Sequence, residues 1–179
     1  NLWAENRSDT DNVRTSLIVL PDNGRLPSVQ ASINHQPGGE LDVAGTRPVR
    51  FAVGGIGRSG PEDRGISERC LVGFNNMPQL MPSVYNNNIQ IVQNRDFVVI
   101  LAEMVHDARM IPLRGNGRLS DAIGLWSGDS RGRWEGSTLV IETRNFNGLT
   151  QSFAGYGSSR NKLLVERLTK VGPRLISYV

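Results

Sequence analysis

The sequence predicts a mostly β protein, an antiparallel sandwich or barrel for which a lipocalin-like meander is one possible form, with long loops rich in Gly and Pro. Short runs of β-branched and apolar residues recur at intervals of roughly 10 to 25 residues. No segment sustains the 3.6-residue periodicity of an amphipathic helix. The 179 residues include 20 Gly and 9 Pro, which favours many short elements joined by turns.

The expected strands span 89–93, 97–104, 138–146, 162–171 and 174–179, and the last two form a hairpin around Gly172-Pro173. Residues 105–113 either continue the second strand or double back along it. A chain of this length can bury an ordinary hydrophobic core, so we expect one β-rich domain over residues 1–179. The abrupt start at Asn1 and the stop at Val179, within an apparent strand, suggest a fragment or a processed form, compatible with a removed secretory signal.

Turns and loops are expected between these strands. The run at 15–20 followed by Pro21-Asp22-Asn23-Gly24 predicts a hairpin, because Asn and Gly tolerate positive φ. Residues 28–61 form a long loop or linker, 120–123 could open a single helical turn, and 126–134 form a glycine-hinged loop. The lone Cys70 is expected to be a small buried residue.

The distribution of charged and apolar residues argues against two classes of partner, nucleic acids and membranes. Eighteen of the 20 basic residues are Arg, and they are scattered among 17 acidic residues for a formal charge of +3. Nucleic-acid binders usually gather basic charge on one face and interleave it with stacking aromatics, so we expect no nucleic-acid partner. No apolar run approaches the roughly 18 to 20 residues of a membrane span. Many Arg side chains are instead expected to pair with Asp and Glu.

The densest cluster of ionisable groups in an apolar setting lies between Glu103 and Arg109. In a straight strand Glu103, Asp107 and Arg109 would share one face, and a bulge near Val105 would turn His106 to the same side. We therefore expect Glu103, His106 and Arg109 as catalytic candidates, with Glu103 or His106 moving a proton and Arg109 holding an oxyanion. The alternative is an Arg–Glu ion pair that braces the sheet.

A metal site is less favoured. The Glu-Xaa-Xaa-His spacing of Glu103 and His106 suits a metal on a helix, but it falls on an expected strand, and the only other histidine is His35. We expect no metal and no organic cofactor. Calcium bound by the loop at Gly128-Asp129-Ser130 stays open as an alternative.

The segment Gly128–Gly136 supplies the substrate-binding candidates Asp129, Arg131 and Trp134, joined by Tyr85 before the strand at 89–93. A Trp flanked by Arg and Glu can stack a sugar or an aromatic ligand, or it can anchor the core. Ser130 fits the letters of Gly-Xaa-Ser-Xaa-Gly, but the expected strand after it replaces the helix that a nucleophile elbow needs.

These stretches resemble a family of uncharacterised bacterial proteins that mostly carry export signals. The resemblance covers nearly the whole chain and includes Glu68-Arg69-Cys70, Tyr85-Asn86-Asn87, Glu103-Met104-Val105-His106-Asp107-Ala108-Arg109 and Gly128-Asp129-Ser130-Arg131-Gly132-Arg133-Trp134-Glu135-Gly136. It implies a periplasmic or extracellular protein and no particular activity.

Three functions are compatible with these patterns. The first is an exported lyase, isomerase or hydrolase that acts on a small molecule or carbohydrate by acid–base chemistry. The second is a non-catalytic module that binds a ligand or glycan. The third is a structural subunit of a surface assembly, as a homo-oligomer or paired with a missing segment, because an open strand edge invites another chain.

Overall fold

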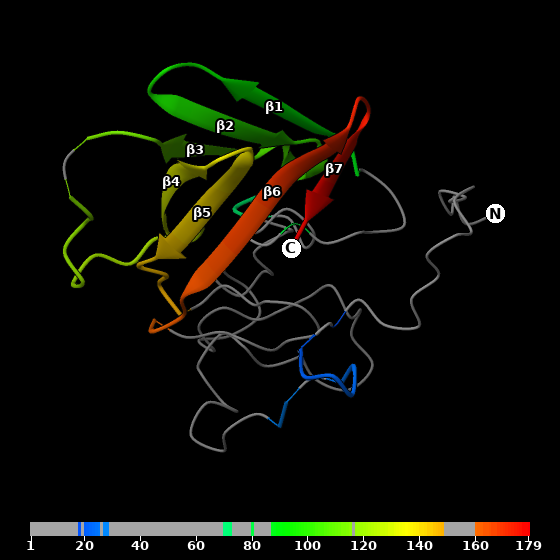
Figure 1. Ribbon diagram of the computed structural model, residues 1–179. Helices are drawn as coiled ribbons and strands as arrows, with labels where there is room; N and C mark the ends of the chain where they lie inside the picture. Colours follow the sequence, from blue (N-terminus) through cyan, green and yellow to red (C-terminus); the bar gives the residue numbers. More distant parts are fainter. Residues whose placement is uncertain are drawn as a thin grey trace.

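The computed structural model describes residues 18, 20–25, 27–28, 70–72, 80, 87–115, 117–148 and 160–179. Within them the chain is almost entirely β, as the sequence predicts (Figure 1). The elements are β1 (Ile89–Gln93), β2 (Phe97–Ala102), the 3-10 turn η3 (Met104–His106), β3 (Ala108–Pro112), β4 (Asp129–Glu135), β5 (Thr138–Arg144), β6 (Leu164–Gly172) and β7 (Leu175–Tyr178).

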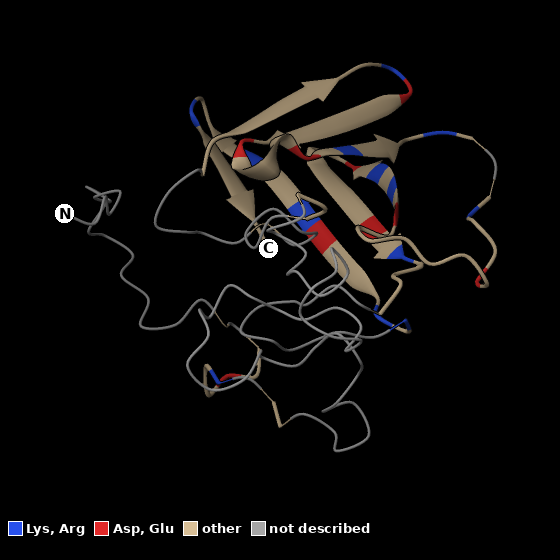
Figure 2. Cartoon of the chain, turned by 180° about the vertical axis from the view of Figure 1, so that it is seen from behind, with Lys and Arg blue, Asp and Glu red and all other residues tan. Residues whose placement is uncertain are grey.

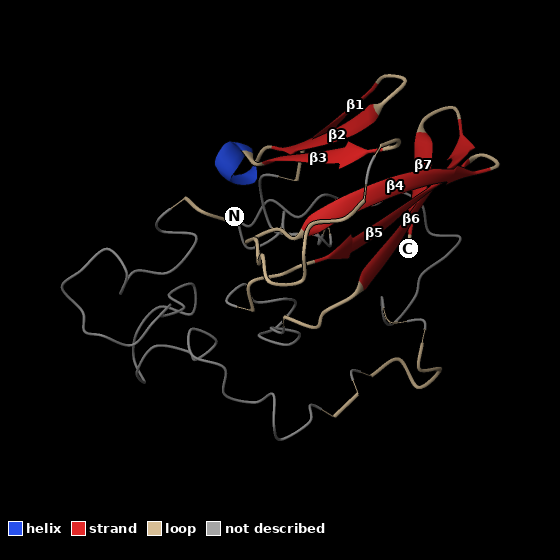
Figure 3. Ribbon diagram, turned by 90° about the vertical axis from the view of Figure 1, so that its left-hand side faces the viewer, coloured by secondary structure: helices blue, strands red, loops and turns tan. Residues whose placement is uncertain are grey.

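The strands form two antiparallel meanders that lie as separate layers (Figure 3). One sheet has the order β1-β2-β3 and the other the order β4-β5-β6-β7. Within each sheet every strand therefore pairs with its neighbour in sequence; most of these connections are short turns, whereas β5 and β6 are joined by residues 145–163. At the β1–β2 turn, for example, the side-chain oxygen of Asn94 accepts hydrogen bonds from the backbone of Asp96 and of Phe97, both at 2.8 Å. The two sheets do not close into a barrel, and the arrangement is that of a sandwich.

The core fills the space between the two sheets. Alternate residues of each strand point inward, as the two-residue period of a strand requires. The central cluster takes three residues from the first sheet and three from the second: Val98, Ile100, Ile111, Leu139, Ile141 and Leu168. Gly132 of β4 also faces this space, where a Cβ atom would lie 2.9 Å from the side chains of both Ile111 and Leu113.

The structure confirms several elements and corrects others. The strand at 89–93 and the final hairpin are present, and the Pro21–Gly24 turn closes through a 2.9 Å hydrogen bond from the amide of Gly24 to the carbonyl of Pro21. The strand expected over 97–104 ends at Ala102, because the chain reverses through η3 and doubles back as β3. Residues 29–61 of the long loop, and all of the run at 15–20 except Ile18 and Leu20, lie outside the described residues.

Two further expectations were wrong. Residues 129–135 form strand β4 and not a loop, because Gly132 provides room for close packing while the neighbouring Arg side chains point away from the core. Cys70 is exposed, with a positive φ of 54°, and is not a buried residue.

Candidate functional site

Glu103 and His106 line one hollow, at the point where β2 ends and the chain reverses. The hollow has a volume of about 260 Å³ and also touches the start of β1. Its lining combines an aliphatic floor with polar side chains: Asn88, Ile89, Gln90, Leu101, Ala102, Glu103 and His106. Of the three expected catalytic residues, the structure therefore brings two together at a surface that a small molecule can reach.

The backbone of this reversal is strained. Val105 has φ 59° and His106 has φ 44°, so two consecutive non-glycine residues occupy the left-handed region. A β-branched residue such as Val105 rarely adopts this conformation. Hydrogen bonds hold the turn in place, from the amide of His106 to the carbonyl of Glu103 at 3.2 Å and from the amide of Ala102 to the carbonyl of Asp107 at 2.9 Å. This tight turn replaces the bulge expected near Val105, and it still places His106 beside Glu103.

The electrostatics of the turn are set by carboxylates. Oε2 of Glu103 accepts a 3.3 Å hydrogen bond from the amide of Asn88, which ties the exposed carboxylate to the start of β1. Partial burial raises the pKa of the neighbouring Asp107, while a hydrogen bond from the Ala108 amide and the charges of Arg109 and His106 oppose that rise. The lining of the hollow therefore includes one carboxylate, that of Glu103, and no guanidinium.

Arg109, the third expected catalytic residue, does not line the hollow. Its guanidinium donates two hydrogen bonds, at 2.8 and 3.0 Å, to the carboxylate of Glu166 on the opposite sheet. The Arg109 side chain is 10% exposed and that of Glu166 is 1% exposed. The hydroxyl of Tyr178 donates to the same carboxylate at 2.8 Å and accepts from the amide of Leu80 at 3.0 Å. This geometry agrees with the ion-pair alternative in kind but not in partner, because Arg109 pairs with Glu166 of the other sheet while Glu103 stays exposed.

The buried carboxylate also affects its neighbours. The pKa of Tyr178 is raised, first by burial of the phenol and then by the negative charge of Glu166, because both disfavour a phenolate. The pKa of Lys162 is lowered by burial, against the opposing charge of Glu166. The Lys162 ammonium lies 4.8 Å from the centre of the Phe146 ring, a cation–π distance.

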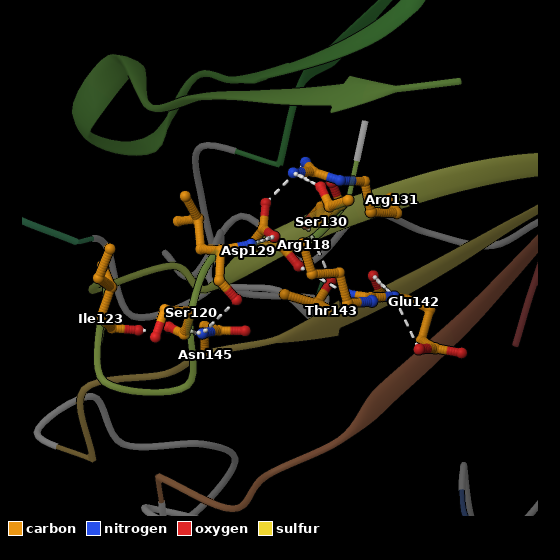
Figure 4. A network of polar contacts seen from close by, with 11 residues as sticks. Arg118, Ser120, Ile123, Asp129, Ser130, Arg131, Glu142, Thr143 and Asn145 are labelled. Atoms are coloured by element: carbon orange, nitrogen blue, oxygen red, sulfur yellow. Dashed lines mark hydrogen bonds and ion pairs between the residues drawn. The ribbon is translucent and has the colours of Figure 1, made fainter. Parts of the chain in front are cut away.

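Asp129 and Arg131 anchor the long connection that precedes β4 (Figure 4). The carboxylate of Asp129 pairs with Arg131 at 2.7 Å and accepts the amide of Leu119 at 3.2 Å. Arg131 also donates to the carbonyl of Gly117 at 3.0 Å. Arg118 donates to the carbonyl of Asp129 at 3.3 Å and to the carboxylate of Glu142 at 2.7 Å. Two of the four expected substrate-binding residues, Asp129 and Arg131, are thus engaged in holding the 117–128 segment, and neither lines the Glu103 hollow.

The other candidates in this segment have separate positions. The hydroxyl of Ser130 is buried and hydrogen-bonded to that of Thr143 at 2.9 Å, so it is no exposed nucleophile. Trp134 is 48% exposed, which rules out the core-anchor alternative and leaves its ring available for stacking. Tyr85 lies outside the described residues.

Acidic and basic groups of β4–β6 lie close enough to form ion pairs. On the outward face, Arg133 and Arg167 both pair with Glu135, at 2.7 and 2.8 Å. Basic and acidic positions lie next to one another over this sheet (Figure 2). Within the described ranges, no group of three or more His, Cys, Asp or Glu could hold a metal ion. Asp129, the calcium candidate, already has a guanidinium as its counter-ion.

The structural roles of two residues, Glu166 and Asn145, were not predicted from the sequence. Glu166 lies 57 residues from Arg109, so only the packing of the sheets joins them. Asn145 has φ 58°, and its amide donates to the carbonyls of Ser120 at 2.9 Å and Ile123 at 3.1 Å. A Glu inside an otherwise alternating strand was the available signal for Glu166, and Asn at a strand end was the signal for Asn145.

Comparison with family models, with curated proteins and with solved structures finds no match. Among the helices of the described residues, none has the length and apolar composition that a bilayer crossing requires.

Proposed function

We propose that this chain is an exported, ligand-binding β domain that holds a small polyhydroxylated molecule, such as a saccharide, in the hollow at Glu103 and His106. The observation that carries the proposal is the lining of this hollow. Ile89, Leu101 and Ala102 offer aliphatic surface, while Glu103 and His106 offer hydrogen-bonding groups. Export to the periplasm or the cell exterior rests on the resemblance to exported bacterial proteins.

The chemistry of the lining favours a neutral polyol. The amides of Asn88 and Gln90 supply donors and acceptors, the carboxylate of Glu103 accepts, and the imidazole of His106 does either. Sugars present C–H faces to aliphatic surface and hydroxyl groups to such polar side chains. Anionic ligands are disfavoured, because Glu103 and nearby Asp107 carry negative charge and Arg109 is held by Glu166.

Acid–base catalysis on the same ligand is a second candidate function, favoured by the strain at Val105 and His106. Strained backbone costs about 1–3 kcal/mol per residue and clusters at functional sites. In this version Glu103 removes a proton from a substrate carbon or hydroxyl, and His106 returns one to the leaving or rearranging oxygen. Arg109 takes no direct part, so the activity would be a lyase or isomerase reaction without an arginine at the oxyanion.

Saccharide binding can be measured by ligand-observed and amide-observed NMR with a panel of neutral mono- and disaccharides. We expect saturable binding and shifted amide signals at Gln90, Glu103 and His106. Glu103→Gln should weaken binding about tenfold, because a neutral amide replaces a charged acceptor. His106→Ala should weaken it by a similar factor, because it removes a hydrogen-bonding group at the contact. The matched control is Glu142→Gln, a half-buried carboxylate on the other sheet, which should leave binding unchanged.

Mass spectrometry of the same mixtures separates the two candidate functions. Binding without any change in ligand mass or isomer composition supports the binding module. Conversion that disappears in Glu103→Gln, while the melting temperature stays within a few degrees, supports the enzyme. Shifts that map to Trp134 or to the 117–128 segment, and that persist in Glu103→Gln, would refute the assignment of this hollow.

A further inference from the structure

β1 is an open edge of the first sheet. All five of its residues are exposed, including Ile91 at 39% and Val92 at 54%. In the part of the chain that the structure describes, β1 pairs with β2 alone, so its other edge has no partner strand. Figure 3 shows β1 at the outer margin of its layer. An exposed, apolar edge strand is a template for pairing with another chain.

The hydrogen bonds between β1 and β2 determine which backbone N–H and C=O groups of β1 point away from β2. The amide of Glu103 donates to the carbonyl of Asn88 at 3.0 Å, and the amide of Asn94 donates to the carbonyl of Phe97 at 2.9 Å. Hydrogen-bonded and non-bonded pairs alternate along an antiparallel ladder. The even-numbered residues of β1 therefore bond to β2, and the backbone groups of the odd-numbered residues point outward: Ile89, Ile91 and Gln93.

The edge is also free of charge. Residues 87–94, Asn-Asn-Ile-Gln-Ile-Val-Gln-Asn, contain no ionisable side chain. Edge strands usually avoid self-association through charged residues, bulges or short length. β4 has such protection, because four of its seven residues are charged, and β7 pairs with β6 through a register shift between Lys170 and Gly172. β1 has none of these features.

The outer face of this sheet is apolar as well. The register places Val92 beside Val99 and Val99 beside Met110, which is 62% exposed. Such a face does not by itself say what covers it. The edge of β1 is more specific, because it carries no charge along its length and a second copy of the same edge can therefore pair with it about Ile91 without opposing like charges.

We propose that β1 pairs with β1 of a second copy of this chain, in a two-fold symmetric dimer with Ile91 opposite Ile91 and Ile89 opposite Gln93. Three outward residues from each copy then form about six backbone hydrogen bonds, and two three-stranded sheets join into one of six. The isoleucine side chains of the two edges pack together on the inner face, and no like charges oppose one another. The dimer shares Ile89 with the lining of the hollow, but its backbone pairing requires no ligand.

Introducing a charge at residue 91, which lies on the symmetry axis, tests the register of the dimer. In sedimentation velocity, the unsubstituted chain should show a concentration-dependent dimer. Ile91→Lys and Ile91→Glu should each raise the dimer Kd about tenfold or more, because identical charges then lie directly opposite one another. An equimolar mixture of the two variants should dimerise again through the Lys–Glu pair. The matched controls, Val165→Lys and Val165→Glu on exposed positions of β6, should dimerise like the unsubstituted chain.

Amide hydrogen exchange on the unsubstituted chain gives a second readout that needs no variant. On raising the protein concentration through the Kd, the amides of Ile91 and Gln93 should become at least tenfold more protected, while those of Gln90 and Val92 stay protected by β2 throughout. A chain that remains monomeric at millimolar concentration overturns the proposal. Dimers that persist unchanged in Ile91→Lys, or charge variants that fail to form a mixed dimer, overturn it too.

Discussion

Arg109 of β3 and Glu166 of β6 form a two-pronged ion pair that crosses the interior of the sandwich, at 2.8 and 3.0 Å. The pair lies beside the apolar core, and Tyr178 supplies a third hydrogen bond to the carboxylate at 2.8 Å. Because the planar guanidinium and the planar carboxylate form two parallel hydrogen bonds, the pair offsets much of the free energy lost when the two charges leave water. It also fixes one register between two sheets that are otherwise held mainly by hydrophobic contact.

Removing the arginine should unfold the protein more easily. Arg109→Met leaves the Glu166 carboxylate buried without its counter-ion, which typically costs about 3–5 kcal/mol. Urea denaturation measures the loss of unfolding free energy. Arg144→Met, which breaks a pair whose arginine is 52% exposed, should cost less than about 1 kcal/mol. Equal losses in the two variants would show that the crossing pair does not brace the sheets.

Stability should depend on Tyr178 at alkaline pH. The raised pKa of its buried phenol means that the folded state favours the protonated form, so this contribution is complete below the unfolded pKa of about 10. It is lost as pH rises above that value toward the folded pKa. Tyr178→Phe should be less stable at pH 7 by about 1–3 kcal/mol, because it loses a hydrogen bond to a charged group. The difference from the unsubstituted chain should shrink above pH 10, as urea titrations from pH 7 to 11 will measure, and a constant difference would contradict the assignment.

Asn145 should control the 117–128 segment. Its amide donates to carbonyls of that segment and its backbone has a φ of 58°. Asn145→Gly keeps the backbone conformation but loses these donors, at a cost of about 1–3 kcal/mol. Asn145→Asp should cost more, because a buried carboxylate would face carbonyl oxygens. Hydrogen exchange should accelerate at the amides of Leu119 and Ile123 and stay unchanged at Ile111. The opposite ranking of the two variants would count against this role.

Gly132 should be intolerant of a side chain. An added Cβ would lie 2.9 Å from side-chain atoms of Ile111 and Leu113, so these side chains or the strands that carry them would have to shift. Gly132→Ala should destabilise the chain by about 1–3 kcal/mol in urea denaturation. Gly172→Ala is the control, because its Cβ would meet the nearest atom at an ordinary 3.6 Å. Leu113→Ala should cost less in the Gly132→Ala background than alone, and additive losses would argue against a direct clash.

Much of the local structure was predictable. The turn between the strands expected at 89–93 and 97–104, and the turn at Gly172-Pro173, depend on residues whose conformations are set within a few positions, and the strands on either side follow from β-branched content. β4 was mistaken for a loop because its glycines and charges resemble turn chemistry. Gly132 is in a strand for a reason that lies in another sheet, namely the space that Ile111 and Leu113 occupy.

The candidate site divides in the same way. Glu103 and His106 were found because they are three residues apart, and a turn of any kind near Val105 brings them to one side. Arg109 was placed with them because it is near in sequence. The direction of its guanidinium depends on Glu166, which lies 57 residues away in the sequence. The buried carboxylate of Glu166 accepts two charge-assisted hydrogen bonds from this guanidinium, and these favour the inward orientation of the Arg109 side chain.

The sequence by itself determined the β class of this protein, its turns and the ionisable residues available for chemistry, because these depend on short-range conformational preferences and on composition. Only the tertiary structure decided which charges are neutralised within the core and which remain at the surface. That choice depends on which side chains the packing of two sheets brings within hydrogen-bonding distance. It leaves Glu103 and His106 exposed at a hollow, and it places Arg109 in the interior.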